Sequence, residues 1–261
     1  MKRLAFRDRL RSLSSARKSR IVLALDITNP STNRLRREVK DLLSRTAESI
    51  VALKINYHLM LPFSKKELTE IITVAHSHNI EVIADMKLND IAPTNINVTS
   101  YLWEVGFDAV IANPIAGFSG GLDVVLEDAH RKGKGVIVLV YMSNSGAKET
   151  YGLTVLSEGK ETSLYHEFLR RALSWGADGV VVGGTRLDVL RGISGIVAHR
   201  VDIFSPGIGV QGGSAKEAVE AGADYLIVGR SVVGAADPTK AATEIRSDSW
   251  IAQQKGTRSL P

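Results

Sequence analysis

Cysteine is absent from the 261-residue sequence, which excludes disulfide bonds and thiolate metal sites. No apolar run approaches the roughly 18 residues that a membrane-spanning helix needs. Hydrophobic residues make up 44% of the chain, enough to build a sizeable core. These features predict a globular cytoplasmic protein with no membrane partner.

The net positive charge of the chain is confined to its first 20 residues. That segment holds eight Lys or Arg and a single acid, Asp8, whereas the whole chain has a net charge of only +5. The body of the protein is therefore slightly acidic, and we expect no nucleic-acid partner. Phe6, Leu10 and Leu13 fall on one helical face, so residues 1–19 are predicted to form a basic helical extension packed on the domain. A transit peptide is the alternative.

Eight short, β-branched apolar runs alternate with segments of helical spacing. This pattern predicts a single α/β domain, a (β/α)8 TIM barrel over residues 20–246, because about 250 residues is the usual length of that fold. A doubly wound open sheet is the rival, but no glycine-rich fingerprint follows the first run. Residues 247–261 are polar and aperiodic and are predicted to form a C-terminal tail. The predicted strands are 21–25, 50–55, 80–85, 109–112, 136–140, 179–182, 201–204 and 225–228.

Three Gly-x-Asp triplets support this alternation. They lie at 106–108, 176–178 and 222–224, each between a helical segment and an apolar run. Glycine at a helix end can adopt the left-handed conformation that turns the chain directly into a strand. Three unrelated turns are the alternative.

Two acids and a lysine surround the end of the third apolar run, at Asp85, Lys87 and Asp90. Residues two apart on a strand share a face, so Asp85 and Lys87 are predicted to project together. An ammonium group between carboxylates keeps its proton and can serve as a fixed cation and a proton donor. Lys54 ends the neighbouring strand and is predicted to complete a Lys-Asp-Lys-Asp array. The alternative is a surface cluster of salt bridges.

Glycine-rich turns follow the last two apolar runs. Residues 205–213 offer backbone N–H groups that can approach an anion, and Ser214 can cap the next helix. Arg230 follows Gly229 and can bind a phosphate through two hydrogen bonds. Because phosphate sites after strands seven and eight are common in barrels, we predict a phosphorylated ligand. Simple turn glycines are the alternative.

The loop from residue 142 to about residue 158 is long and polar, which predicts a lid or binding loop with Ser143 at its base. A solvated loop without a role is the alternative. No metal site is predicted. The six histidines fall mostly in helical segments, and two lysines make the acids Asp26, Asp85 and Asp90 a poor Mg²⁺ site.

With these residues the sequence resembles the orotidine 5′-monophosphate decarboxylase family, in its short microbial form, over about residues 20–246. The family motif is matched by Asp85, Lys87, Asp90, Ile91 and Thr94. Ala92, which Pro93 follows, and Asn144-Ser145 depart from the family pattern and could alter the rigidity of two loops. Further matches are Leu25-Asp26, Lys54, Met142-Ser143, Gly146-Ala147, Gln211-Gly212-Gly213 and Gly229-Arg230-Ser231.

The resemblance implies a cofactor-free decarboxylation of orotidine 5′-monophosphate to UMP and CO2 in pyrimidine biosynthesis. Asp26 and Lys54 would bind ribose hydroxyls, and Lys54 would also hold Asp85 in place. Asp85 would face the substrate carboxylate, and Lys87 would stabilise and protonate the carbanion at C6.

The resemblance also implies the rest of the site and a homodimer. Asp90 and Thr94 would enter the site of the partner subunit and bind its ribose. The pyrimidine would contact Ser143, and the phosphate would contact Gln211, Gly229 and Arg230.

Two other functions stay open at this point. The first is a metal-dependent decarboxylase or aldolase of the same suprafamily, acting on a sugar phosphate such as 3-keto-gulonate 6-phosphate. Those relatives place Glu where this chain has Lys54. The second is a non-catalytic barrel that binds a phosphorylated metabolite.

Overall fold

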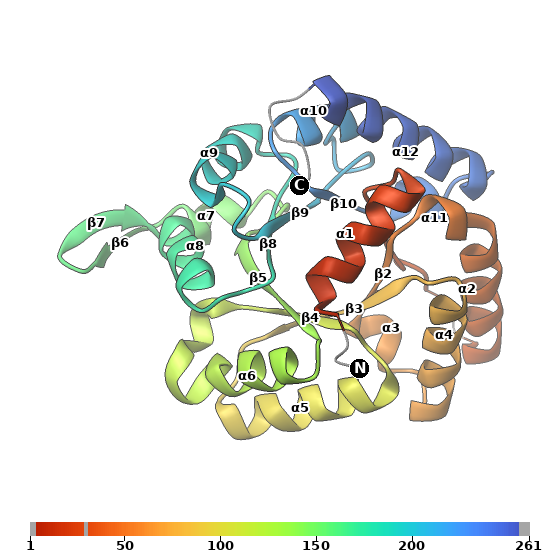
Figure 1. The fold of residues 1–261 in the computed structure, drawn as a ribbon, viewed down its shortest axis with the longest axis horizontal. Coiled ribbons are helices and arrows are strands. Elements are labelled where there is room, and N and C mark those ends of the chain that lie inside the picture. Colours follow the sequence, from red (N-terminus) through yellow and green to blue (C-terminus); the bar gives the residue numbers. More distant parts are fainter. Residues whose placement is uncertain (1–3, 29–30, 256–261) are drawn as a thin grey trace.

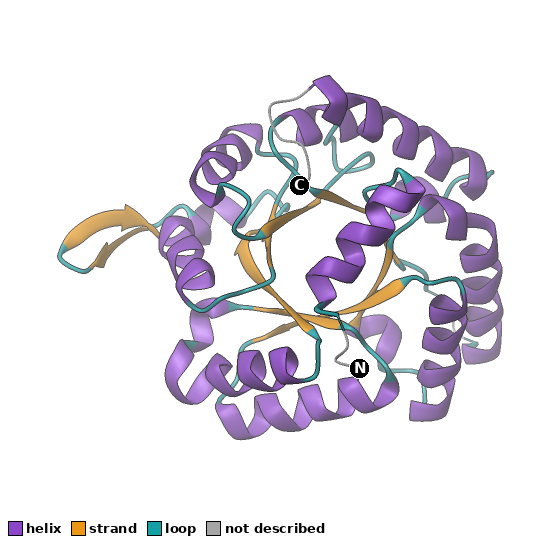
Figure 2. Cartoon of the chain, in the orientation of Figure 1, coloured by secondary structure: helices purple, strands orange, loops and turns teal. Residues whose placement is uncertain are grey.

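A computed structural model of the chain describes residues 4–28 and 31–255. Eight parallel strands form a closed barrel in the order β1-β10-β9-β8-β5-β4-β3-β2, which confirms the predicted (β/α)8 fold (Figures 1 and 2). Each barrel strand coincides with one of the predicted apolar runs. The barrel strands are β1 (Ile21–Ala24), β2 (Ala52–Asn56), β3 (Glu81–Leu88), β4 (Ala109–Ala112), β5 (Gly135–Tyr141), β8 (Gly179–Val182), β9 (Asp202–Pro206) and β10 (Tyr225–Val228).

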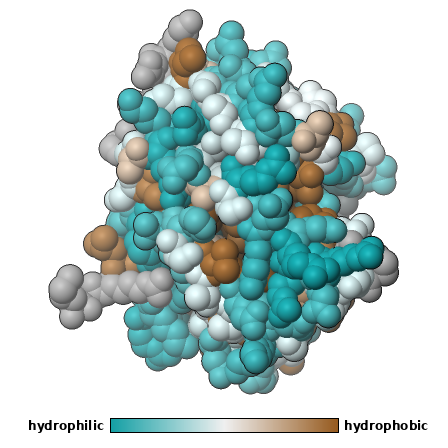
Figure 3. Space-filling view, turned by 90° about the vertical axis from the view of Figure 1, so that its right-hand side faces the viewer, coloured by the Kyte–Doolittle hydropathy of each residue, from teal (hydrophilic) through white to brown (hydrophobic). Residues whose placement is uncertain are grey.

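Helices surround the barrel and bury their apolar faces against it (Figure 2). Within the described ranges no helix is both long and apolar enough to cross a bilayer. The face that carries α2 and α4 is largely hydrophilic (Figure 3). The helices are α1 (Phe6–Arg17), α2 (Thr32–Thr46), α3 (Tyr57–Met60), α4 (Lys65–Ser77), α5 (Ala92–Val105), α6 (Asp123–Arg131), α7 (Ala147–Tyr151), α8 (Leu164–Ser174), α9 (Leu187–Val197), α10 (Ala215–Glu220), α11 (Arg230–Val233) and α12 (Pro238–Lys255).

Helix α1 crosses one end of the barrel (Figure 1). Phe6 and Leu10 of its apolar face are fully buried, as expected for a packed amphipathic helix. Its arginines contact acids at the start of the barrel strands: Arg11 lies 2.6 Å from Asp202, and Arg9 lies 2.7 Å from Glu81. The basic N-terminal segment thus neutralises carboxylates of the barrel itself.

The three Gly-x-Asp triplets end helices as predicted. Their glycines have φ values of 119°, 72° and 107°, the left-handed region that glycine adopts without a Cβ clash. The aspartates have a role that the sequence pattern did not indicate. Each carboxylate accepts the backbone N–H of a residue at a strand start, at 2.8–3.0 Å. The pairs are Asp108 with Val82, Asp178 with Val136, and Asp224 with Ile203.

The prediction of an aperiodic tail is wrong for residues 247–255, because helix α12 continues to Lys255. Ser249 and Ala252 are buried, and the Arg20 guanidinium lies 5.7 Å from the centroid of the Trp250 ring. These contacts anchor a helix whose sequence periodicity is weak. Residues 256–261 of the predicted tail lie outside the described residues.

The segment predicted as a long polar loop contains secondary structure. Helix α7 forms within it, with Ala147 and Tyr151 buried. The antiparallel strands β6 (Thr154–Ser157) and β7 (Lys160–Ser163) follow as a hairpin that projects away from the barrel (Figure 1). Polar composition concealed both elements, since only a few of their side chains face the core.

Strand β3 ends in a bulge. Its register against β4 shifts between Ala84 and Leu88, and Lys87 has a left-handed φ of 44°. This conformation costs a non-glycine residue roughly 1–2 kcal/mol. The alternation of side chains along a strand predicted that Asp85 and Lys87 project together. It did not predict the bulge that gives Lys87 its backbone conformation.

The carboxylate of Asp108 should make folding sensitive to acid. Burial alone would raise its pKa, but a hydrogen bond from His76 and the charge of Lys134 lower that pKa from 3.8 to about 2. A depressed pKa contributes stability that is present above about pH 4 and lost as the pH falls towards 2.

We expect Asp108→Asn to lower the free energy of unfolding by about 2 kcal/mol at pH 7 and to weaken its dependence on pH between 4 and 2. Urea unfolding at several pH values measures both effects. The exposed Asp41 serves as control, since Asp41→Asn should change stability by less than about 0.5 kcal/mol. An unaltered acid dependence in Asp108→Asn would contradict the assignment.

The bulge makes a second prediction about stability. In a regular strand, a protein with glycine is less stable than the same protein with alanine by roughly 0.5–1 kcal/mol. At position 87 we expect the reverse, with Lys87→Gly about 1 kcal/mol more stable than Lys87→Ala, because glycine adopts a positive φ without a Cβ clash. Urea unfolding of the two variants decides the order. A more stable alanine variant would mean that the left-handed backbone imposes no constraint.

Candidate active site

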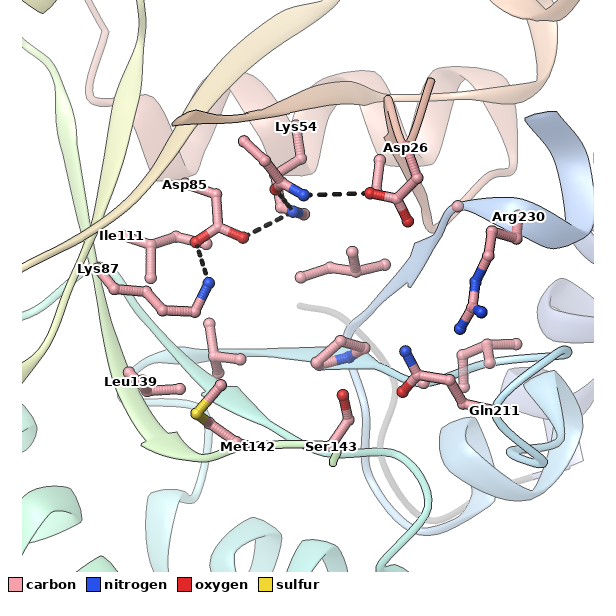
Figure 4. Close-up of a pocket in the computed structure, with 18 of the residues that line it drawn as sticks. Asp26, Lys54, Asp85, Lys87, Ile111, Leu139, Met142, Ser143, Gln211 and Arg230 are labelled. Atoms are coloured by element: carbon pink, nitrogen blue, oxygen red, sulfur yellow. Dashed lines mark hydrogen bonds and ion pairs between the residues drawn. The ribbon is translucent and has the colours of Figure 1, made fainter. Parts of the chain in front are cut away.

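One pocket at the C-terminal ends of the barrel strands collects most of the predicted site residues (Figure 4). Its lining also includes apolar side chains such as Ile111, Leu139 and Met142. A concave site with an apolar wall and a few converging polar groups is typical of small-molecule binding. The predicted residues that line it are Asp26, Lys54, Asp85, Lys87, Ser143, Gln211, Gly229 and Arg230.

At one end of the pocket Asp85 lies between two ammonium groups. Lys54 Nζ donates to Asp85 Oδ2 at 2.6 Å, and Lys87 Nζ donates to Asp85 Oδ1 at 2.8 Å. The strand register explains the first contact, because Lys54 and Asn56 of β2 pair with Ile83 and Asp85 of β3. The predicted contacts among Lys54, Asp85 and Lys87 are therefore present in the structure.

The two lysines determine the ionisation of Asp85. Its side chain is only 8% exposed, and burial alone would raise its pKa. The charges and hydrogen bonds of Lys54 and Lys87 outweigh that effect and lower the pKa of Asp85 below its usual value. The site therefore keeps a buried negative charge at neutral pH, flanked by two positive charges.

Asn56 belongs to this site, although sequence reasoning missed it. Its amide oxygen accepts a hydrogen bond from Lys54 Nζ, and its amide nitrogen donates to Asp26 Oδ1 at 3.1 Å. Its position two residues after Lys54 on the same strand was the available signal, since such residues share a face.

Gly229 leaves room for the carboxylate of Asp26. A Cβ atom at position 229 would lie 2.3 Å from Asp26 Oδ2, far inside van der Waals contact. Glycine at this position therefore lets Asp26 face the pocket from the end of β1.

The opposite end of the pocket holds the predicted phosphate-binding residues. Gln211 and Arg230 lie beside each other there, across the pocket from Lys87 (Figure 4). The loop that carries Gln211 is closed by a hydrogen bond from Gly209 N to Gly213 O at 2.7 Å. Ser214 caps α10 by accepting from Glu217 N at 3.3 Å, as predicted. The exposed Arg230 guanidinium offers an anion several donors at once.

Ser143 lies between the two ends, at the base of the segment predicted as a lid (Figure 4). Thr185 Oγ1 donates to its backbone oxygen at 3.4 Å. The rings of Tyr141 and Tyr151 pack with their centroids 5.6 Å apart. These contacts attach the base of the segment to the barrel and leave Asn144 and Ser145 exposed.

Asp90 and Thr94 do not line this pocket. Asp90 is exposed, and its Oδ1 accepts the backbone N–H of Ile91 at 2.7 Å. The buried Asn95 anchors the loop that carries Asp90, because its amide nitrogen donates hydrogen bonds to the backbone oxygens of Asp90 and Gly121. Within one chain, the predicted Lys-Asp-Lys-Asp array is therefore incomplete: Lys54, Asp85 and Lys87 are in contact, and Asp90 lies apart from them.

The donor set of the pocket suits an anionic substrate better than a cation. Lys54, Lys87 and Arg230 line it together with Asp26 and Asp85. Among the described residues, no three His, Asp or Glu side chains gather closely enough to hold a metal ion. The arrangement can bind a phosphate at one end, and at the other it can place a proton donor beside a fixed negative charge.

Comparisons with known proteins agree with this geometry. Orotidine 5′-phosphate decarboxylase of Methanosarcina mazei is 35% identical over 230 residues, which are 87% of this chain and 94% of that protein. The structure of Leishmania donovani OMP decarboxylase matches with a TM-score of 0.82 at 27% identity, over 96% of this chain and 100% of that chain. Leishmania donovani UMP synthase matches with a TM-score of 0.84 at 28% identity, over 96% of this chain but 57% of that longer chain.

A family model describes the same relationship along the sequence. The model of the orotidine 5′-phosphate decarboxylase / HUMPS family matches residues 19–245, which span all eight barrel strands and both ends of the pocket. This match and the relatives above show that the chain belongs to the orotidine 5′-phosphate decarboxylase / HUMPS family.

Proposed function

We propose that this chain decarboxylates orotidine 5′-phosphate to UMP and CO2 without a metal or a cofactor. The observation that carries the proposal is the buried Asp85 carboxylate between Lys54 and Lys87, in the same pocket as Arg230 and Gln211. The name carried by the relatives supports the same activity. The reaction would belong to the synthesis of pyrimidine nucleotides in the cytoplasm. The absence of cysteine fits such a reducing compartment.

Without a cofactor the site has no electron acceptor, so a nearby positive charge must stabilise the carbanion that forms when CO2 leaves. The substrate carboxylate would lie against Asp85, and repulsion between the two anions would disfavour the bound ground state. As CO2 leaves, the electron pair of the broken bond stays on C6, close to the Lys87 ammonium. Lys87 would stabilise that charge and then donate its proton to C6.

The remaining side chains would bind the parts of the substrate that do not react. Asp26 and Lys54 would bind ribose hydroxyls, and Ser143 would contact the pyrimidine. Gln211, Gly229 and Arg230 would bind the phosphate. Binding energy from these remote groups can be used to position the ring and exclude water from it.

A two-fold homodimer would complete the site, with Asp90 and Thr94 of each subunit reaching the ribose in the partner subunit. The exposed position of both residues supports this arrangement. Large apolar side chains are exposed on the loops after β2, β3 and β4, as at an interface: Leu61 is 78% exposed, Ile91 63% and Ile115 57%.

A metal-dependent sugar-phosphate enzyme of the same family is the second candidate. The ammonium of Lys54 counts against it, because it occupies the acidic cluster where a divalent cation would need a ligand. The loss of ultraviolet absorbance of orotidine 5′-phosphate, followed with EDTA present, separates the candidates. Turnover supports the proposal, whereas turnover that requires added metal, or no turnover, contradicts it.

Arg230 should act only through the phosphate. Arg230→Ala is expected to lower kcat/KM for orotidine 5′-phosphate by at least about a hundredfold, because a bidentate charged contact is lost. The slow reaction of the nucleoside without phosphate should change less than about threefold. Arg37→Ala, which removes an exposed arginine of α2, is the control. Equal losses on both substrates would remove Arg230 from the phosphate site.

Mixed dimers test the shared site. Lys87→Ala and Asp90→Ala homodimers should each be nearly inactive, because every site lacks one group. Refolding equal amounts together gives about half heterodimers, each with one intact site and one site that lacks both groups. Activity should therefore recover to roughly a quarter of wild type per subunit. Verified heterodimers without recovery would mean that Asp90 acts in its own chain.

A further inference from the structure

Asn56 links the side chains of Lys54 and Asp26, between which the described structure has no direct hydrogen bond or ion pair. It is the last residue of β2, and its side chain is half-buried. On one side it accepts from the ammonium of Lys54, which also donates to Asp85 at 2.6 Å. On the other side it donates to Asp26 at 3.1 Å. A continuous path of hydrogen bonds thus runs from Asp26 to Asp85 (Figure 4).

The chemistry of the two neighbours fixes the orientation of the Asn56 amide. An ammonium group can only donate hydrogen bonds, and an ionised carboxylate can only accept them. The amide must therefore turn its oxygen to Lys54 and its nitrogen to Asp26. Aspartate at this position would place a second carboxylate against Asp26, and leucine would leave both neighbours without this partner.

The amide also keeps Lys54 directed at Asp85. Among the described residues, Asp26 has no ion-pair partner, and it lies one strand away from Lys54 at the end of β1. Without a neutral spacer the Lys54 ammonium would be attracted to both carboxylates. Any movement towards Asp26 would weaken the contact that holds Asp85 ionised and in place.

We propose that Asn56 is a positioning residue that holds Lys54 on Asp85 and Asp26 on the substrate ribose, so that ribose binding and the reacting centre are coupled. The inference rests on the proposed decarboxylation and on the proposed ribose contact of Asp26. It assigns to Asn56 a role in turnover through its neighbours and no direct contact with the reacting atoms.

The test compares Asn56→Leu and Asn56→Asp with the wild type on three substrates. These are orotidine 5′-phosphate and its 2′-deoxy and 3′-deoxy analogues. Both variants should lower kcat for the full substrate by at least about tenfold, because a Lys54 that is no longer held on Asp85 would stabilise the transition state less, relative to the bound ground state, than it does in the wild type. With at least one deoxy analogue the loss should be at least about threefold smaller, because that analogue lacks the hydroxyl to which Asn56 is coupled.

Asn33→Leu is the matched control, because Asn33 is exposed on α2 and, among the described residues, its side chain forms a hydrogen bond only with the nearby Arg36. It should leave all three reactions unchanged. Unfolding in urea checks that each variant is folded, and Asn56→Asp keeps nearly the wild-type size if Asn56→Leu is unstable.

Two results would overturn the role of Asn56. One is wild-type kcat and KM in folded Asn56 variants, and the other is a loss of the same factor on all three substrates, which a merely structural role would give. A wild-type protein that does not turn over would instead refute the proposed function. In that case the affinity for UMP, measured by calorimetry, would still test the role of Asn56. The Asn56 variants must bind UMP at least about threefold more weakly than the wild type if Asn56 orients Asp26.

Discussion

The charge of Asp85 is the constraint on which the active site depends. A carboxylate that is 8% exposed is stable as an anion only with strong partners, and two lysines provide them. Each lysine comes from a different structural feature: Lys54 from the neighbouring strand β2, and Lys87 from the bulge of β3, the strand that also carries Asp85. Removal of either lysine would leave the buried charge partly uncompensated.

The two ends of the barrel use charge in different ways. At the N-terminal end, the arginines of α1 and the carboxylates of Glu81 and Asp202 pair with each other and stabilise the fold. At the C-terminal end, the side chains of Lys87 and Arg230 extend towards a pocket. This division is common in barrels, where one face supports stability and the other carries the chemistry.

The sequence was sufficient for the barrel, because buried parallel strands are continuous apolar runs and each run became a strand. Most site residues were also predictable, since the C-terminal ends of parallel strands meet in space. Asn56 was missed, although its spacing from Lys54 on one strand was a signal. The left-handed backbone of Lys87 and the extension of α12 were not predictable, because they depend on contacts between distant segments, such as β3 with β4 and Arg20 with Trp250, which no local pattern records. The position of Asp90 relative to a partner subunit depends on a second chain.

The account is tested most directly by neutralising Asp85 without changing its size. Rapid mixing can measure the affinities of Asp85→Asn for orotidine 5′-phosphate and for UMP, and single turnover can measure its decarboxylation rate. If the buried charge disfavours the substrate carboxylate, the affinity ratio of substrate to UMP should rise by at least about tenfold relative to wild type, or about 1.4 kcal/mol. Decarboxylation should become slower, because the bound ground state is stabilised more than the transition state. An unchanged affinity ratio, or a wild-type rate, would contradict the account.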